Sequence, residues 1–291
     1  MKWTQINVHT SSEAEEAVVQ ILLDMGARGV AVGTDGSGPV VTAYLAEAGP
    51  EAANAVQRRV AALAGFGLDP GAARVTVARV DDEDWAESWK RHYRPLEIGR
   101  RLLVKPAWID IDPGRRLVIE LDPGMAFGTG YHPTTALCLE ALEDVVKPGH
   151  VVVDVGTGSG ILGIAAARLG AAAVVGVDTE PEAVEAAVEN VRRNGVGGVM
   201  TVARGSTDTA RRMLVPPAQA DVVVVNILAR VIDRLAEELH ELLKPGGVMV
   251  AGGIIDHAAD GLMERLRSVG FGIEDERRRG EWCCLIARRV D

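Results

Sequence analysis

The sequence has few cysteines and few aromatic residues. It contains 3 cysteines among 291 residues, and aromatic side chains make up 4% of the chain. Cys138 stands alone and Cys283 lies beside Cys284, so the set is odd and lacks the spacing of a disulfide framework or a zinc site. We therefore expect reduced, structural cysteines and no metal centre.

Long apolar runs and targeting segments are also missing. The most apolar stretch, residues 151–177, is interrupted by Asp154, Arg168 and several glycines, whereas a membrane span needs about 18 or more apolar residues. No apolar segment follows Lys2, which excludes a signal peptide or a transit peptide. The sequence thus predicts a cytoplasmic protein without membrane contact.

The chain has no excess of positive charge. Its 41 acidic and 31 basic residues give a net charge of -10, and no long segment is basic. A dominant contact with nucleic acid is therefore disfavoured, whereas a basic protein partner would be attracted. The hydrophobic content of 47% is that of a globular protein, and the length fits two domains.

Residues 1–80 follow the order β-α-β-β-α-β. A strand-like alternation opens the segment, and Ser12 with Glu15 forms a capping-box signature ahead of helical spacing. Two short strands, a second helix from Pro50 and a last strand complete the order. This is the order of a small ferredoxin-like α+β domain.

The remaining chain divides into a linker and a larger domain. Residues 81–95 place Trp85, Trp89 and Tyr93 four apart, which predicts a connecting helix. From residue 96 to residue 291, valine-rich strands alternate with helical stretches of about 10–15 residues. Such alternation indicates a Rossmann-like α/β fold with a mostly parallel sheet covered on both faces.

The sharpest motif is a strand from Val151 followed by a loop with Gly156, Gly158 and Gly160 and then a helix. Glycines allow a tight turn and let a ligand approach the backbone. The loop also satisfies the dinucleotide fingerprint, with Asp178 about 20 residues further on. An NAD-dependent oxidoreductase therefore stays one alternative, and a non-catalytic cofactor-binding module another.

Asp154 precedes the first glycine by two positions and favours a cationic ligand. Its carboxylate would repel a pyrophosphate and attract an ammonium or sulfonium group. S-adenosylmethionine fits this requirement, with Asp178 holding the ribose. Asn226 ends another strand, where its side-chain carbonyl could hold an amine, and we predict it as the catalytic residue.

The pattern Asp-x-Gly-x-Gly-x-Gly with a following acid resembles the class I methyltransferases. Over essentially the whole chain, the sequence further resembles the ribosomal protein L-eleven methyltransferase family. The segments that carry this resemblance are DWAESWKRHYRPLEIG, FGTGYHPTT, DVGTGSGIL, GVDTEPEA and NILA. It implies an enzyme that methylates lysine side chains, and in some members the N-terminal amine, of that ribosomal protein, with the N-terminal domain recognising the substrate.

The resemblance also implies a set of cofactor contacts. The residues expected to contact or cover the cofactor are Phe127, Gly128, Thr129, Gly130, Thr135, Gly156, Asp178, Gly205, Ser206 and Asn226. We interpret His132 as ordering its loop rather than acting as a base, and we expect a monomer. The nearest alternative is a related protein-lysine methyltransferase with another target, such as an electron-transfer flavoprotein subunit.

Overall fold

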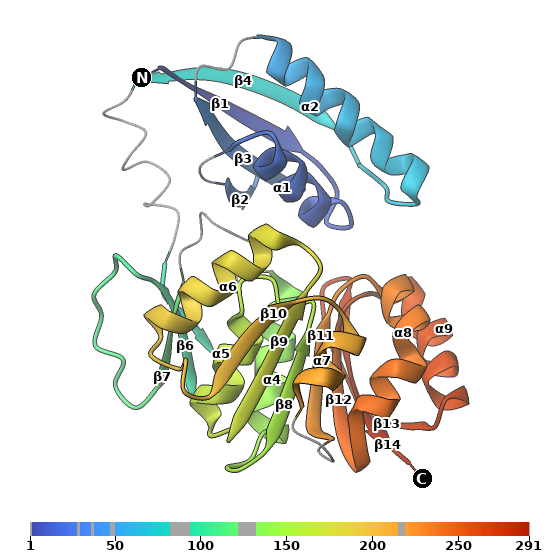
Figure 1. Cartoon of the computed structure of the whole chain (residues 1–291). Coiled ribbons are helices and arrows are strands. Elements are labelled where there is room, and N and C mark those ends of the chain that lie inside the picture. The colour runs from blue at the N-terminus through green and yellow to red at the C-terminus, as the bar shows by residue number, and fades with distance from the viewer. Residues whose placement is uncertain are drawn as a thin grey trace. The chain divides into compact units, whose positions relative to one another are not determined.

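The computed structural model contains two compact units (Figure 1). One holds the described residues up to Arg94 and the other those from Pro95 onward. Each unit has hydrophobic core clusters of its own. The structure describes residues 2–27, 30–35, 38–46, 50–81, 94–121, 132–214 and 219–290.

The first unit has the predicted ferredoxin-like order. Its elements are β1 (Lys2–His9), α1 (Glu15–Asp24), β2 (Val30–Thr34), β3 (Pro39–Ala46), α2 (Pro50–Ala62), a short 3-10 helix (Leu63–Phe66) and β4 (Arg74–Asp81). The strands pair antiparallel in the order β2-β3-β1-β4. Alternate residues of β1, such as Ile6 and Val8, are fully buried with the apolar side chains of the two helices.

The predicted capping box of α1 is wrong. The helix begins at Glu15 with Ala14 at the N-cap, and no side chain caps it there. Instead, the Oγ atom of Ser11 accepts a hydrogen bond from the backbone N–H of Ala14 at 3.1 Å. Residues 12–14 form a turn before the helix, so Ser12 lies too early to serve as the cap. The predicted connecting helix lies almost entirely outside the described residues.

The second unit is built on a seven-stranded sheet in the order β10-β9-β8-β11-β12-β14-β13. Its strands are β8 (Val151–Val155), β9 (Ala173–Asp178), β10 (Met200–Arg204), β11 (Ala220–Asn226), β12 (Leu243–Ile255), β13 (Phe271–Arg279) and β14 (Trp282–Arg289). Neighbours from β10 to β12 are parallel, and β14 is antiparallel to both β12 and β13. The Rossmann-like prediction is confirmed.

Helices cover both faces of this sheet (Figure 1). Val152 and Val224 pack on the face of α4 and α5, whereas Val153 and Val225 pack on the face of α8 and α9. The helices are α4 (Pro133–Val145), α5 (Ile161–Leu169), α6 (Pro181–Arg193), α7 (Thr207–Met213), α8 (Ala229–Leu242) and α9 (Asp256–Ser268). A smaller sheet of β5 (Leu96–Ile98), β6 (Leu102–Pro106) and β7 (Leu117–Leu121) joins the core on the α4 side.

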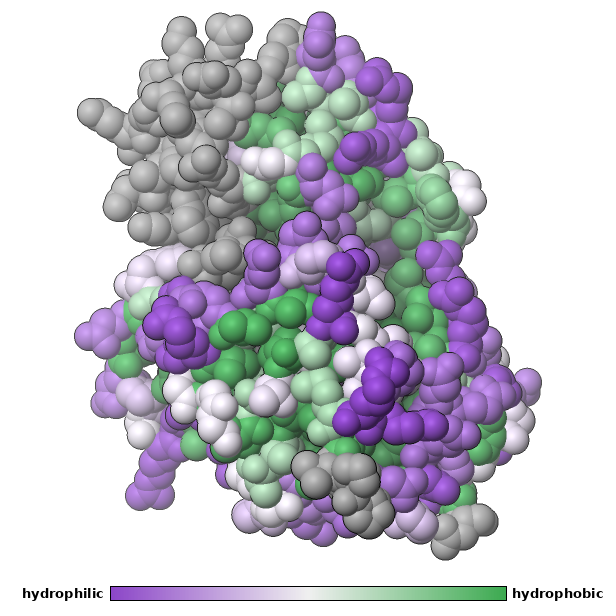
Figure 2. Space-filling view, viewed as in Figure 1, coloured by the Kyte–Doolittle hydropathy of each residue, from purple (hydrophilic) through white to green (hydrophobic). Residues whose placement is uncertain are grey.

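The outer surface of the second unit is hydrophilic where α8 and α9 lie (Figure 2). There, Arg265 of α9 forms an ion pair with Glu237 of α8 at 2.6 Å. The apolar sides of both helices are turned to the sheet, where Leu239 and Leu266 are fully buried. Within the described residues, no helix is long and apolar enough to cross a membrane.

Candidate active site

The strand order of the large sheet predicts where a ligand would bind. From β8 the chain runs outward through β9 to β10 and then returns to place β11 on the other side of β8. Open α/β sheets bind ligands at such a switch point, beyond the carboxyl ends of the strands. Asp154 of β8 and Asn226 of β11 lie at these ends, since Asp154 is in register with Val224.

The carboxylate of Asp154 connects the glycine loop to the helix that follows it. Its Oδ2 atom accepts hydrogen bonds from Thr157 Oγ1 at 2.7 Å and from the backbone N–H of Gly163 at 2.9 Å. The residue is fully buried, and its Oδ1 atom has no hydrogen-bond partner among the described residues. Burial raises the pKa of Asp154 to about 6, the charge of Asp178 adds to that rise, and the two hydrogen bonds oppose it.

Asp178 joins three segments at the end of β9. Its Oδ2 atom accepts from the N–H of Gly158 at 2.9 Å, and Oδ1 accepts from the N–H of Glu180 at 3.1 Å. Its backbone carbonyl accepts from Gly205 N–H at 2.8 Å, so Gly205 and the adjoining Ser206 lie beside it. Each carboxylate oxygen can accept a second bond, which leaves capacity for ligand hydroxyl groups.

The three glycines of the loop all have positive φ, at 72° for Gly156, 53° for Gly158 and 84° for Gly160. A Cβ atom on Gly156 would also lie 2.5 Å from the Cγ2 atom of Ile227, directly after Asn226. The loop is thus strained for any other residue and packs tightly against the end of β11. Glycine serves local packing here in addition to allowing a ligand to approach.

Asn226 lies beside Thr135, although 91 positions separate them in the chain. Its Nδ2 atom donates to Thr135 Oγ1 at 3.4 Å, and its buried Oδ1 atom has no hydrogen-bond partner in the described part of the chain. Thr135 is fully buried near the start of α4. The arrangement leaves one amide oxygen free to accept a hydrogen bond at the switch point.

The similarity of this chain to known proteins covers the site and nearly all of the sequence. The model of the ribosomal protein L11 methyltransferase (PrmA) family matches residues 2–290. The chain belongs to this family. A ribosomal protein L11 methyltransferase of Caldanaerobacter subterraneus subsp. tengcongensis is 40% identical, with 99% of each chain covered. That of Anoxybacillus flavithermus is also 40% identical, covering 99% of this chain and 100% of its own.

A solved structure agrees with this assignment to the L11 methyltransferase family. The crystal structure of ribosomal protein L11 methylase from Lactobacillus delbrueckii subsp. bulgaricus matches with a TM-score of 0.62 and 33% identity. It covers 68% of this chain and 100% of its own. The predicted family resemblance is confirmed, and the alternatives of an oxidoreductase or a different methyltransferase family gain no support.

In this member of the L11 methyltransferase family, His132 has a structural role at the start of α4. It is the N-cap of α4, where Nδ1 accepts from the N–H of Thr134 at 3.3 Å and lies 2.8 Å from Thr134 Oγ1. Its ring meets that of Trp282 edge-on, with the centroids 4.8 Å apart. Burial lowers the pKa of His132 to about 4, so the imidazole is neutral near pH 7.

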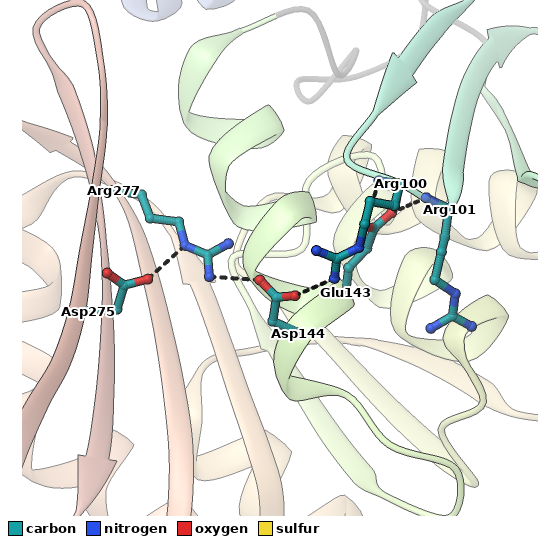
Figure 3. Close-up of polar contacts among 6 residues, drawn as sticks. All are labelled: Arg100, Arg101, Glu143, Asp144, Asp275 and Arg277. Atoms are coloured by element: carbon teal, nitrogen blue, oxygen red, sulfur yellow. Dashed lines mark hydrogen bonds and ion pairs between the residues drawn. The ribbon is translucent and has the colours of Figure 1, made fainter.

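Acidic residues near the other end of α4 fix the helix to its surroundings (Figure 3). The buried carboxylate of Glu143 accepts from the backbone N–H groups of Arg100 and Arg101, at 2.9 and 2.7 Å. Asp144 pairs with Arg100 and with Arg277 of β13, at 2.8 Å each. Helix α4, which carries Thr135, is therefore tied to both the small sheet and the edge of the large one.

The structure brings most of the predicted site residues together. Those gathered at the switch point and along the ends of β9 and β10 are Thr135, Asp154, Gly156, Gly158, Gly160, Asp178, Gly205, Ser206 and Asn226. Phe127, Gly128, Thr129 and Gly130 lie outside the described residues. Two groups that support the loop, Thr157 and Gly163, were not predicted as site residues; their signals were the threonine within the glycine loop and the third glycine of the dinucleotide fingerprint.

Proposed function

We propose that this chain transfers methyl groups from S-adenosylmethionine to lysine side-chain amines of ribosomal protein L11. The family and the names of its relatives support the methyl transfer and the protein substrate. One observation of the site carries the chemistry. Two buried acceptor oxygens, Asp154 Oδ1 and Asn226 Oδ1, lack partners in the described chain and lie at the ends of adjacent strands.

The residues of the glycine loop fit S-adenosylmethionine. Asp154 offers a buried negative charge with one oxygen unpartnered, which suits the ammonium or sulfonium of this ligand and would disfavour a pyrophosphate. Asp178 would accept from the ribose hydroxyl groups, and Gly205 with Ser206 would lie near the adenine. When bound, the cofactor supplies an electrophilic methyl group on a positively charged sulfur.

Asn226 is the residue that would hold the accepting amine. With Nδ2 directed to Thr135, the remaining Oδ1 can accept an N–H of the amine. An amine held by one of its N–H bonds keeps its lone pair available for in-line attack. Holding the amine in this orientation is the main way in which a protein accelerates such a displacement.

The amine must be neutral to attack, and a lysine with a pKa near 10.4 pays about 4–5 kcal/mol for this at pH 7. The buried imidazole of His132 is a poor candidate for the base, because its Nδ1 is already engaged with Thr134 and its pKa is low. We infer that loss of hydration near a positive sulfur favours the neutral amine instead.

We further propose that three segments of the chain have separate roles. Residues 1–80 recognise the protein substrate, residues 81–95 connect, and residues 96–291 carry out methyl transfer. Phe127, Gly128, Thr129 and Gly130 form a loop over the cofactor. The enzyme acts as a monomer in the cytoplasm, where ribosomal proteins are made.

Mass spectrometry of L11 after incubation with the full-length enzyme and S-adenosylmethionine tests this function. We expect lysines carrying one, two or three added methyl groups. The Asn226→Ala variant should lose about 10²-fold in kcat while keeping its affinity for S-adenosylhomocysteine within about threefold, because the lost contact orients the amine. Normal methylation by this variant would remove the role assigned to Asn226, and an unmodified L11 would refute the function.

A further inference from the structure

Cys138 lies on α4 one turn after Thr135, and the proposed chemistry does not use it. Its side chain is fully buried. Its sulfur lies against the point where Gly252 would carry a Cβ atom, and Asn226 Oδ1 lies 2.8 Å from the same point. Gly252 is the register partner of Asn226 on β12. The thiol and the carboxamide oxygen are therefore neighbours above one glycine of the sheet.

Helix α4 consequently reaches the surroundings of Asn226 at two points. Residues three apart lie on the same face of a helix, so Thr135 and Cys138 both face the strand ends. Thr135 accepts from Nδ2 of Asn226, and Cys138 fills the space near Oδ1. The sulfur of Cys138 also lies 3.9 Å from that of Cys284 on β14. The core thus holds the Cys138 sulfur in place.

We infer that Cys138 is a positioning residue for methyl transfer, whose sulfur keeps the carboxamide of Asn226 oriented toward the amine. This inference rests on the proposed role of Asn226. A smaller side chain at position 138 would leave a void near the carboxamide, and voids in a close-packed interior allow neighbouring groups to shift. A misplacement of about 1 Å can slow a reaction by about 10²-fold, so this packing bears on turnover.

The thiol suits this place because it packs without reacting. The hydrogen bond with Cys284 and burial raise the pKa of Cys138 well above its usual range, and the charges of Cys284 and Asp154 add to the rise. The thiolate is the nucleophilic form of cysteine. A neutral Cys138 therefore does not compete with the amine for the methyl group.

The test compares Cys138→Ala with Cys283→Ala in the full-length enzyme. Both cysteines are fully buried, but Cys283 packs in the core on the opposite face of the sheet, so it is a matched control. With L11 as substrate, we expect Cys138→Ala to lower kcat about tenfold and to accumulate partly methylated lysines. Its Kd for S-adenosylhomocysteine should change by less than about twofold. Cys138→Ser, which restores an atom in place of the sulfur, should regain most of the lost turnover.

Two results would overturn the inference. One is an equal kcat and methylation pattern for the two alanine variants, and the other is a parallel loss of cofactor affinity and turnover in Cys138→Ala. If Cys138→Ala does not fold, Cys138→Val, which adds bulk near the carboxamide, is measured with the same expectations. Asn226→Ala, assayed alongside, tests the proposed function separately, since its normal activity would refute the role of Asn226 whatever Cys138 does.

Discussion

At the scale of single residues, burial changes the protonation of Asp154 and thereby the stability of the enzyme. Its folded pKa of about 6 lies above the ordinary value of 3.8. Between these pH values the folded enzyme without ligand binds more protons than the unfolded chain, so its stability falls as pH rises through the window from about 4 to 6. The loss is about 3 kcal/mol and is complete above that window. A cation bound beside the Oδ1 atom of Asp154 would offset this loss of stability.

The Asp154→Asn substitution separates the two roles of this side chain. The amide oxygen can still accept from Thr157 and Gly163, so denaturant unfolding at pH 7.5 should show equal or greater stability, by at most about 3 kcal/mol. Calorimetry should show S-adenosylmethionine bound at least about tenfold more weakly. The wild-type affinity should also fall as pH drops below 6. A variant that binds the cofactor like the wild type would contradict the electrostatic role.

The sequence predicted where a residue lies in the fold when its place relative to a motif was enough, whereas its role stays a prediction. Asp178 and Asn226 end valine-rich strands, and Asp154 lies one residue before the end of another. Parallel strands bring such ends to one edge. The contact of Cys138 with the site could not be predicted in this way. It depends on how α4 packs over β12 and β14, which local spacing does not encode.

At the scale of elements, α4 connects the small sheet to the site. Glu143 accepts two backbone N–H groups of the turn between β5 and β6, and Gly99 in that turn has a φ of 54°. Burial alone would raise the pKa of the neighbouring Asp144, but the hydrogen bonds from Arg277 and Arg100 outweigh it and lower the pKa. The two adjacent carboxylates thus bind different groups: Glu143 binds a backbone turn, and Asp144 binds two arginine side chains.

Substituting each carboxylate in turn tests this difference. Glu143→Ala leaves two backbone donors without acceptors and should lower the free energy of unfolding by about 2–3 kcal/mol. Asp144→Ala removes two side-chain ion pairs, one with the exposed Arg100 and one with the half-buried Arg277, and should cost less than about 1 kcal/mol. Denaturant titrations of the two full-length variants provide the comparison. Equal losses would show that the backbone turn does not depend on Glu143.

The sequence predicted elements more reliably than their ends. Valine-rich runs between helical stretches indicated every strand from β8 to β12, because strands buried on both faces read as continuous apolar segments. The predicted start of α1 was wrong, because the turn at residues 12–14 moves the N-cap position from Ser12 to Ala14. Such a shift of a few positions depends on the path of the preceding chain.

At the scale of the whole molecule, the two units and their sheet orders agree with the α/β and ferredoxin-like predictions. The order β10-β9-β8-β11 matters most for function, because it places the end of β8 beside that of β11. Alternation of strands and helices predicted a parallel sheet but did not give this order, which depends on how the strands pair in space. The domain roles and the boundaries at residues 80 and 95 stay predictions.

The most direct measurement is calorimetry of the full-length protein with S-adenosylhomocysteine and, separately, with NAD. The buried carboxylate of Asp154 and the proposed contact of Asp178 with the ribose predict saturable binding of S-adenosylhomocysteine at one site per chain. They predict no measurable heat with NAD, whose phosphates the carboxylate repels. Binding of NAD without binding of S-adenosylhomocysteine would contradict the account.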